Sequence, residues 1–216
     1  MKVTSLIAGL VLVASISTAR AAIIAHWTFE TSVPTTAGPH AAEAGDNAGA
    51  GSPASGFHAG AATVYSNPAG NGSAESFSSN TWATGDYYQF QTSTVGYSLI
   101  AIEWCQVRSS TGPADFTLEG STDGSTFSSL LANYTVLSSP SWSSGTPQPT
   151  TCFSAVAAPA SFDNQAAVYF RLTSNETPSN AGGTNRVDDV KIITIPEPTS
   201  LGLLAFGAVV ALRRRR

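Results

Sequence analysis

The side chains that most often perform catalysis are sparse in this 216-residue chain. The three histidines, His26, His40 and His58, lie in no His-Glu-x-x-His pattern, and the sequence contains no Gly-x-Ser-x-Gly elbow. We expect His26 to be structural and the other two to be solvated. Glu103 and Glu119 are the best carboxylate pair, and glycoside hydrolysis would require them about 5–10 Å apart in a cleft. We therefore expect no enzymatic activity, with a secreted polysaccharide hydrolase as the alternative.

Aromatic side chains offer a second kind of site, because apolar ring faces can stack on the apolar C–H faces of sugars. The candidates for such stacking are Trp82, Tyr87, Tyr88, Trp104 and Trp142. Trp104 lies among isoleucines and is expected in the core. Trp82 and Trp142 lie in segments rich in Ser, Thr and Gly, where we expect them to be exposed. We therefore predict that Trp82 and Trp142 bind a ligand.

Short strands must position these residues, because the chain lacks the strong helix formers of long amphipathic helices. Apolar alternation between Gly, Pro, Ser and Asn turns predicts strands over residues 24–29, 63–65, 87–92, 98–108, 114–121, 130–137, 168–173 and 186–194. Residues 31–60 show almost no periodicity, and we interpret them as a surface excursion with a short helix near 41–43. At least eight antiparallel strands without helical partners predict an all-β, antiparallel two-sheet sandwich.

Two segments resemble parts of known β-sandwich domains. Residues 116–127 read Phe-Thr-Leu-Glu-Gly-Ser-Thr-Asp-Gly-Ser-Thr-Phe, which is similar to a hairpin of discoidin-like and carbohydrate-binding jelly rolls. Asp123-Gly124 within it is typical of a hairpin turn. Residues 186–192, Arg-Val-Asp-Asp-Val-Lys-Ile, look like the closing strand of such domains. The resemblance implies a jelly-roll-like fold and identifies no sugar-binding residue.

The same resemblance implies a structural cation, because many sugar-binding jelly rolls hold calcium between their first and last strands. Glu30 ends the first predicted strand, and Asp188 lies in the last. Calcium prefers several hard oxygens from carboxylates and carbonyls. We therefore predict a calcium site at Glu30 and Asp188. The alternative is that Asp188 and Asp189 are a solvated pair unrelated to Glu30.

The two cysteines predict one disulfide. Cys105 lies in the longest predicted strand, and Cys152 begins another strand after a loop rich in Pro and Ser. In an exported protein, a lone pair of cysteines is most simply oxidised to a disulfide. A zinc site is disfavoured, because two thiols without a neighbouring histidine do not complete its ligands.

The N-terminus predicts export. Lys2 is followed by an apolar run over residues 6–16 and by Ala-Arg-Ala at 19–21. A positive charge, an apolar run and small residues in this order predict a signal peptide over residues 1–21, cleaved after Ala21. A buried N-terminal helix or strand is the alternative.

The last 21 residues have three parts in a fixed order. The first part is Pro196, Glu197 and Pro198, and the second is an apolar run over residues 201–212. The third is a basic cluster of Arg213, Arg214, Arg215 and Arg216. This order resembles the PEP-CTERM sorting signal of Gram-negative bacteria. The resemblance implies a transient inner-membrane anchor and processing by an exosortase. A 12-residue transmembrane helix spans roughly 18 Å, short of a hydrocarbon core of about 30 Å, which favours temporary retention.

Without its two ends, the chain is one domain over residues 22–195 with a strongly acidic charge. Four basic and 13 acidic residues give this domain a net charge of −9, against −4 for the whole chain. Such a domain repels phosphate backbones, which excludes nucleic-acid binding. We expect a structural or adhesive, glycan-binding protein of the cell surface or extracellular polysaccharide matrix. A scaffold without a small ligand is a further alternative.

Overall fold

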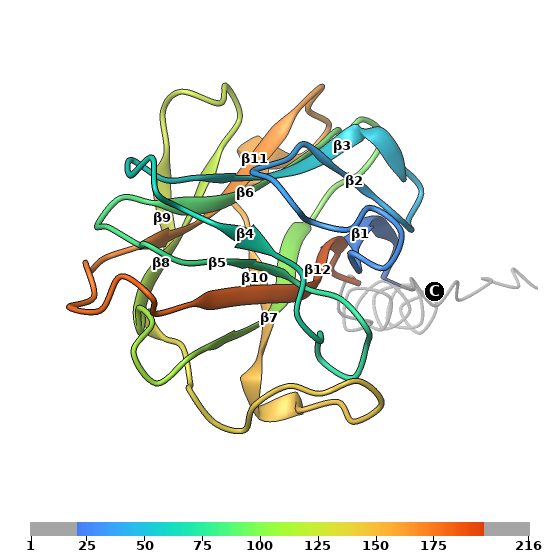
Figure 1. The fold of residues 1–216 in the computed structure, drawn as a ribbon. Helices are drawn as coiled ribbons and strands as arrows, with labels where there is room; N and C mark the ends of the chain where they lie inside the picture. Colours follow the sequence, from blue (N-terminus) through green and yellow to red (C-terminus); the bar gives the residue numbers. More distant parts are fainter. Residues whose placement is uncertain (1–20, 197–216) are drawn as a thin grey trace, which may run out of the picture. The chain divides into compact units, whose positions relative to one another are not determined.

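Two antiparallel sheets pack face to face in the computed structural model, which describes residues 21–196 (Figure 1). Residues 1–20 of the predicted signal peptide, all but the first residue of the C-terminal motif, and the predicted transmembrane helix lie outside this range. Within it, no helix has the length and hydropathy that crossing a bilayer requires. The prediction of an all-β sandwich is confirmed.

The first sheet, called here the β7–β12 sheet, has β12 near its centre. Its strands in spatial order are β10 (Cys152–Ala157), β7 (Ile100–Arg108), β12 (Asn185–Thr194), β5 (Phe77–Ser79) and β4 (Tyr65–Ser66). The first strand, β1 (Ile23–Trp27), pairs with β12 and brings the two ends of the domain together. This meeting of the terminal strands is the arrangement on which the calcium prediction depends.

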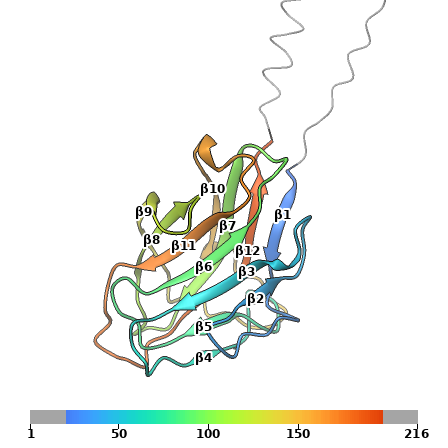
Figure 2. The same cartoon turned by 90° about the horizontal axis from the view of Figure 1, so that it is seen from above.

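The second sheet, called here the β6–β11 sheet, is seen from above in Figure 2. Its strands in spatial order are β2 (His40–Ala42), β3 (Gly49–Phe57), β6 (Tyr87–Thr92), β11 (Val168–Ser174), β8 (Asp115–Ser121) and β9 (Ser128–Thr135). Two 3₁₀ turns, η1 (Pro149–Thr151) and η2 (Ala160–Phe162), flank β10.

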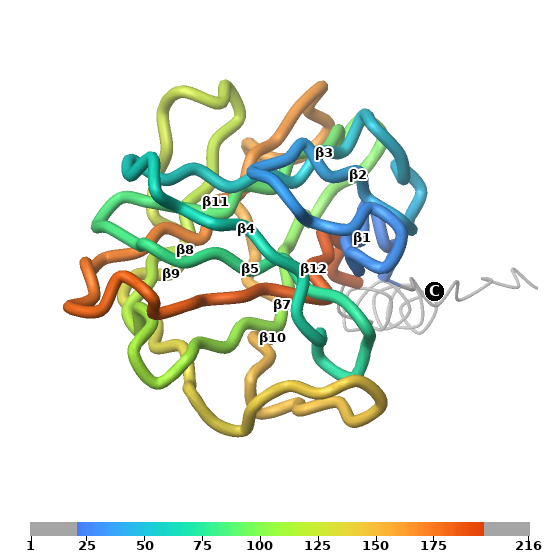
Figure 3. Tube along the Cα trace, viewed as in Figure 1, coloured from blue at the N-terminus to red at the C-terminus, as the bar shows by residue number. Residues whose placement is uncertain are grey.

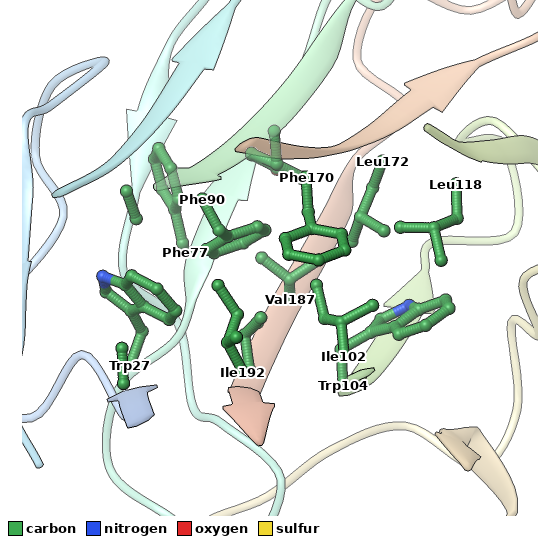
Figure 4. Close-up of a cluster of buried hydrophobic side chains, with 14 of the residues drawn as sticks. Trp27, Phe77, Phe90, Ile102, Trp104, Leu118, Phe170, Leu172, Val187 and Ile192 are labelled. Carbon is green, nitrogen blue, oxygen red and sulfur yellow. The ribbon is translucent and has the colours of Figure 1, made fainter. Parts of the chain in front are cut away.

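The core lies between the sheets and is rich in aromatic residues (Figure 4). In β6 and β11, residues alternate strictly between buried and partly exposed, as in a sheet with one face in the core and one in solvent. Phe90 and Phe170 point inward from these strands, towards Ile102 and Val187 of the other sheet. Each of these side chains is completely buried.

The interpretation of residues 31–60 as an excursion with a helix near 41–43 is wrong. This segment forms β2 and β3, and β3 pairs with β6. The strand reads Gly-Ala-Gly-Ser-Pro-Ala-Ser-Gly-Phe, and Ser52 and Ala54 are its buried residues. Such small residues give no apolar alternation, yet they leave room for Trp27, whose Nε1 donates to the Ser52 carbonyl at 3.0 Å. Tertiary contact, rather than local propensity, makes this segment a strand.

The hairpin predicted at Asp123-Gly124 is present and joins β8 to β9. Gly124 has φ +72°, a left-handed conformation that glycine adopts without steric cost. The Asp123 carboxylate accepts the backbone N–H groups of Ser125 and Thr126, each at 2.7 Å. These bonds hold the pKa of Asp123 down, at about 2.

The predicted disulfide between Cys105 and Cys152 is also present. The two residues lie directly opposite each other on β7 and β10, with their Cα atoms 3.9 Å apart. In Figure 3 the long connection from β9 to β10, coloured yellow, passes beside β7 before it reaches Cys152. The disulfide therefore closes this connection onto the β7–β12 sheet.

Candidate functional site

A row of aromatic rings lies on the outward face of the β6–β11 sheet. Tyr87 of β6 is opposite Phe57 of β3, and both point away from the core because the next residue of β6, Tyr88, is fully buried. Phe57 keeps 48% of its surface exposed and stacks on Tyr87, with ring centroids 5.1 Å apart and planes 18° apart. The partly exposed apolar surface of this stack suits contact with the C–H groups of a sugar.

Arg171 of β11 continues this row. Its guanidinium lies 3.9 Å from the ring centroid of Tyr87 and 3.6 Å from that of Phe127, which lies in the connection between β8 and β9. We call the stack of Phe57, Tyr87, Arg171 and Phe127 the aromatic row. Cation–π attraction to both rings holds the guanidinium in place.

Polar groups flank the aromatic row. Gln89 Oε1 accepts Arg171 Nε at 2.8 Å, and Glu119 is opposite Arg171 in the pairing of β8 with β11. Glu119 Oε2 accepts the Thr173 hydroxyl at 2.6 Å. Aromatic side chains with a few polar groups beside them are the usual constituents of a small-ligand site.

The structure contradicts the expected exposure of Trp82. Its ring is only 4% exposed and packs edge-on against Tyr88, Phe116 and His58 between the ends of the sheets. Its Nε1 donates to the Ser79 carbonyl at 3.0 Å. The polar sequence around Trp82 covers the end of the core, so the ring cannot stack on a ligand in this conformation.

Trp142 is likewise buried, at 5% exposure. It covers the outward side of the β7–β12 sheet, where it packs against Cys105 and Val107. Its Nε1 donates to the Thr151 hydroxyl at 2.8 Å. Trp142 is therefore the hydrophobic centre of a surface loop rather than an exposed platform.

The carboxylates considered for hydrolysis do not form a pair. Glu103 lies on β7 and Glu119 on β8, in different sheets, and both point away from the core that separates those sheets. Glu103 forms an ion pair with Lys191, with 3.1 Å between Oε1 and Nζ. The arrangement required for glycoside hydrolysis by this pair is therefore absent.

The histidines are held within the fold. His58 and His40 were expected to be solvated, and this is wrong: the His58 side chain is 1% exposed beside Asp86, and His40 is 5% exposed. Burial lowers the pKa of both histidines. His26 Nε2 lies 3.0 Å from Asp189 Oδ1 and joins β1 to β12, as expected of a structural residue.

Glu30 and Asp188 reach the same loop, residues 70–75, which lies between β4 and β5. Glu30 accepts the backbone N–H of Glu75 at 2.8 Å, while Asp188 Oδ2 accepts the N–H of Asn71 at 2.7 Å and the Ser73 hydroxyl at 2.8 Å. Within residues 21–196, no group of three or more His, Cys, Asp or Glu side chains is arranged to hold a metal ion. Glu30 and Asp188, the two predicted calcium ligands, therefore both hydrogen-bond to the same loop.

The loop itself supplies further oxygen atoms. A β-carbon added to Gly70 would collide with Asp188 Oδ2, the Ser73 hydroxyl and the Glu75 carbonyl, so these three oxygens pack closely around the Gly70 Cα. Asp188 is 1% exposed, and desolvation raises its pKa from the usual 3.8 to about 6. The buried Asp188 carboxylate therefore lies close to a hydroxyl and a carbonyl oxygen of the same loop.

Sequence patterns identified only part of the aromatic row. Tyr87 was among the aromatic candidates, whereas Phe57, Phe127 and Arg171 were missed. The outward positions of β6 and β11 carry a usable signal, since Tyr87 and Arg171 alternate with buried residues. Phe57 carried no such signal in the sequence, because the strand that contains it, β3, was not predicted.

Comparisons with known proteins support the interpretation of the C-terminal motif and the observed fold. Residues 194–216 match the PEP-CTERM protein-sorting motif, so the resemblance is confirmed and the chain carries the signal of an exported protein sorted by an exosortase. No curated protein matches the chain in sequence.

Solved structures are similar in fold at low identity. The CBM22-1 xylan-binding domain from Paenibacillus barcinonensis has a TM-score of 0.50 and 14% identity, over 83% of this chain and 99% of that domain. The K3 cleaved adhesin domain of Lys-gingipain from Porphyromonas gingivalis W83 has a TM-score of 0.49 and 16% identity, over 82% of this chain and 100% of that domain. The first likeness shows that this chain shares its β-sandwich fold with that xylan-binding domain.

Proposed function

We propose that this exported protein binds glycan chains on the aromatic row and thereby attaches to the cell surface or extracellular polysaccharide. The observation that carries the proposal is the stack of Phe57, Tyr87, Arg171 and Phe127, which presents a partly exposed apolar surface between polar groups. The fold shared with a xylan-binding domain supports it at the level of architecture. Attachment to glycan chains at the surface would be a structural or adhesive role.

Loss of the central ring should weaken glycan binding most. Tyr87→Ala removes the surface that Phe57 and Arg171 both contact, so we expect a loss of about 2 kcal/mol, or roughly 30-fold in affinity. The measurement is titration calorimetry with xylan and with the polysaccharide that the producing cell exports. Val64→Ala, at a residue 59% exposed, is the matched control and should keep wild-type affinity. Equal affinity for the Tyr87→Ala variant, or no binding of either glycan, would contradict the proposal.

We further propose that the PEP-CTERM motif holds the protein briefly in the inner membrane through residues 201–212, until an exosortase removes them. A basic cluster stays on the cytoplasmic side and stops translocation. Replacing Arg213, Arg214, Arg215 and Arg216 with serine should therefore release or missort the protein. Cell fractionation and the intact mass of surface protein measure this. Surface protein that still contained residues 201–216 would rule out the processing step.

A structural calcium ion is proposed for the space between β1, β12 and the loop 70–75. Glu30, Asp188, the Ser73 hydroxyl and the Glu75 carbonyl would hold it, and its charge would offset the repulsion within an acidic domain. The cation must compete with the N–H and hydroxyl donors that now satisfy the two carboxylates. When bound, it stabilises the folded state in proportion to its concentration relative to the dissociation constant.

Calcium should raise the melting temperature most above pH 6. The folded-state pKa of Asp188, about 6, exceeds its usual 3.8, so the folded state binds the extra proton. Without calcium, stability on the order of 3 kcal/mol is present below pH 4 and is lost as pH rises through 6. Asp188→Asn should flatten this slope and abolish the calcium effect, whereas Asp115→Asn, at an exposed position, should do neither. Equal shifts with calcium and sodium at matched ionic strength would exclude a specific site.

A further inference from the structure

A depression lies on the opposite side of the sandwich from the aromatic row. It has a volume of about 580 Å³, and its lining includes Arg108, Arg186 and several serines. Ser66 of β4, Ser78 of β5 and Arg186 of β12 form one row across the outward face of the β7–β12 sheet. The segment after β9 closes one side with Ser138 and Ser141. We call this depression the arginine groove, and its volume lies in the range of small-ligand sites.

The arginine groove concentrates the few positive charges of an acidic domain. Of the four basic residues within residues 22–195, two line it, and no Asp or Glu is among its lining residues. The other two are engaged elsewhere, Lys191 by Glu103 and Arg171 by the aromatic row. Within residues 21–196, neither Arg108 nor Arg186 has a carboxylate within 4.0 Å.

Both guanidinium groups are positioned by neutral partners. Arg108 donates through Nε to the Val136 carbonyl and through Nη1 to the carbonyls of Ser109, Ser110 and Gly112. Arg186 donates through Nη1 to the Ala69 carbonyl at 2.9 Å, and its Cζ lies 5.3 Å from the ring centroid of Trp142. The remaining donors of Arg186, Nε and Nη2, have no hydrogen-bond partner in the part of the chain that the structure describes. Fixed, charged and partly unused donors are suited to bind an anion.

We propose that the arginine groove binds the acidic group of an anionic polysaccharide, with a carboxylate on the arginines and sugar hydroxyls on the surrounding serines. Guanidinium groups match carboxylates in geometry, and hydroxyl side chains both donate to and accept from sugar hydroxyls. The site lies on the other sheet from the aromatic row and does not depend on it. The protein thus has two glycan-binding faces of different chemistry, which allows one molecule to connect two polysaccharide chains.

The experiment measures binding of polygalacturonate, and of its fully methyl-esterified form, to the full-length protein in a neutral detergent. We expect the ester, which lacks the charge, to bind at least about tenfold more weakly, because hydrogen bonds to charged groups are the stronger ones. Arg186→Gln removes the unused donors and should cause a similar loss. Ser141→Glu keeps every contact of Arg186 and places a carboxylate at the exposed rim, so it should lose binding even where Arg186→Gln folds poorly.

Two controls separate this site from general charge and from the aromatic row. Ser161→Glu, at an exposed position outside the arginine groove, changes the net charge equally and should stay within twofold of wild type. Tyr87→Ala should also retain the binding of polygalacturonate. Equal binding of the ester, wild-type affinity in the Ser141→Glu variant, or a loss confined to the Tyr87→Ala variant would overturn the proposal.

Discussion

Replacing Cys105 and Cys152 with alanine should lower the free energy of unfolding by about 4 kcal/mol. The disulfide joins residues 47 positions apart, and the chain-entropy relation gives about 4 kcal/mol for a loop of this length. Its loss also removes the partners of Asn71, whose Nδ2 contacts both sulfurs at 3.2 and 3.1 Å. For a domain of this size, the melting temperature should fall by about 8–16 °C.

Thermal unfolding with and without a reductant measures this effect. Reduction of the wild-type protein should reproduce the shift of the double variant, whereas reductant should not change the double variant itself. The prediction is contradicted if reduction leaves the wild-type melting temperature unchanged, or if peptide mapping of the exported protein finds both thiols free.

Asp86→Ala should destabilise the fold by a similar amount, about 3–5 kcal/mol, because it leaves buried donors without an acceptor. Asp86 is fully buried and accepts the backbone N–H groups of Ala59 at 2.8 Å and Ala83 at 2.7 Å. Its Oδ2 also lies 3.0 Å from His58 Nδ1, and His58 Nε2 contacts Ser79 Oγ at 3.0 Å. The carboxylate therefore ties the end of β3 to the start of β6.

Denaturant unfolding distinguishes this role from a general charge effect. Asp86→Asn keeps the size of the side chain and one of its two acceptor oxygens. It should lower the free energy of unfolding by about half as much as Asp86→Ala, because only one of the neighbouring donors then faces the amide N–H₂. Asp115→Ala removes an exposed carboxylate and should stay within about 0.5 kcal/mol of wild type. A loss for Asp86→Ala no larger than that of Asp115→Ala would refute the structural role.

The sequence alone determined the features that depend on the linear order of residues or on a strong alternation of apolar and polar residues. The C-terminal motif is a linear arrangement of Pro196, Glu197, Pro198, an apolar run and four arginines, so no tertiary contact is needed to identify it. Strand β6 was predicted with its observed bounds, because its buried and partly exposed residues alternate between the two faces of the sheet. The Asp123-Gly124 turn was equally local, and the disulfide followed from the presence of only two cysteines in an exported chain.

Only the tertiary structure decided which residues face solvent and which side chains meet. Trp82 and Trp142 lie in polar segments, yet these segments fold over the core and over the outer side of β7, so both rings are buried. The aromatic row is assembled from β3, β6, β11 and the residues after β8, which are far apart in sequence. The arginine groove is likewise formed by strands that only pairing brings side by side. Local sequence patterns determine which face of a strand is buried, whereas long-range packing determines which strands lie side by side. In this protein, that packing forms both proposed binding faces.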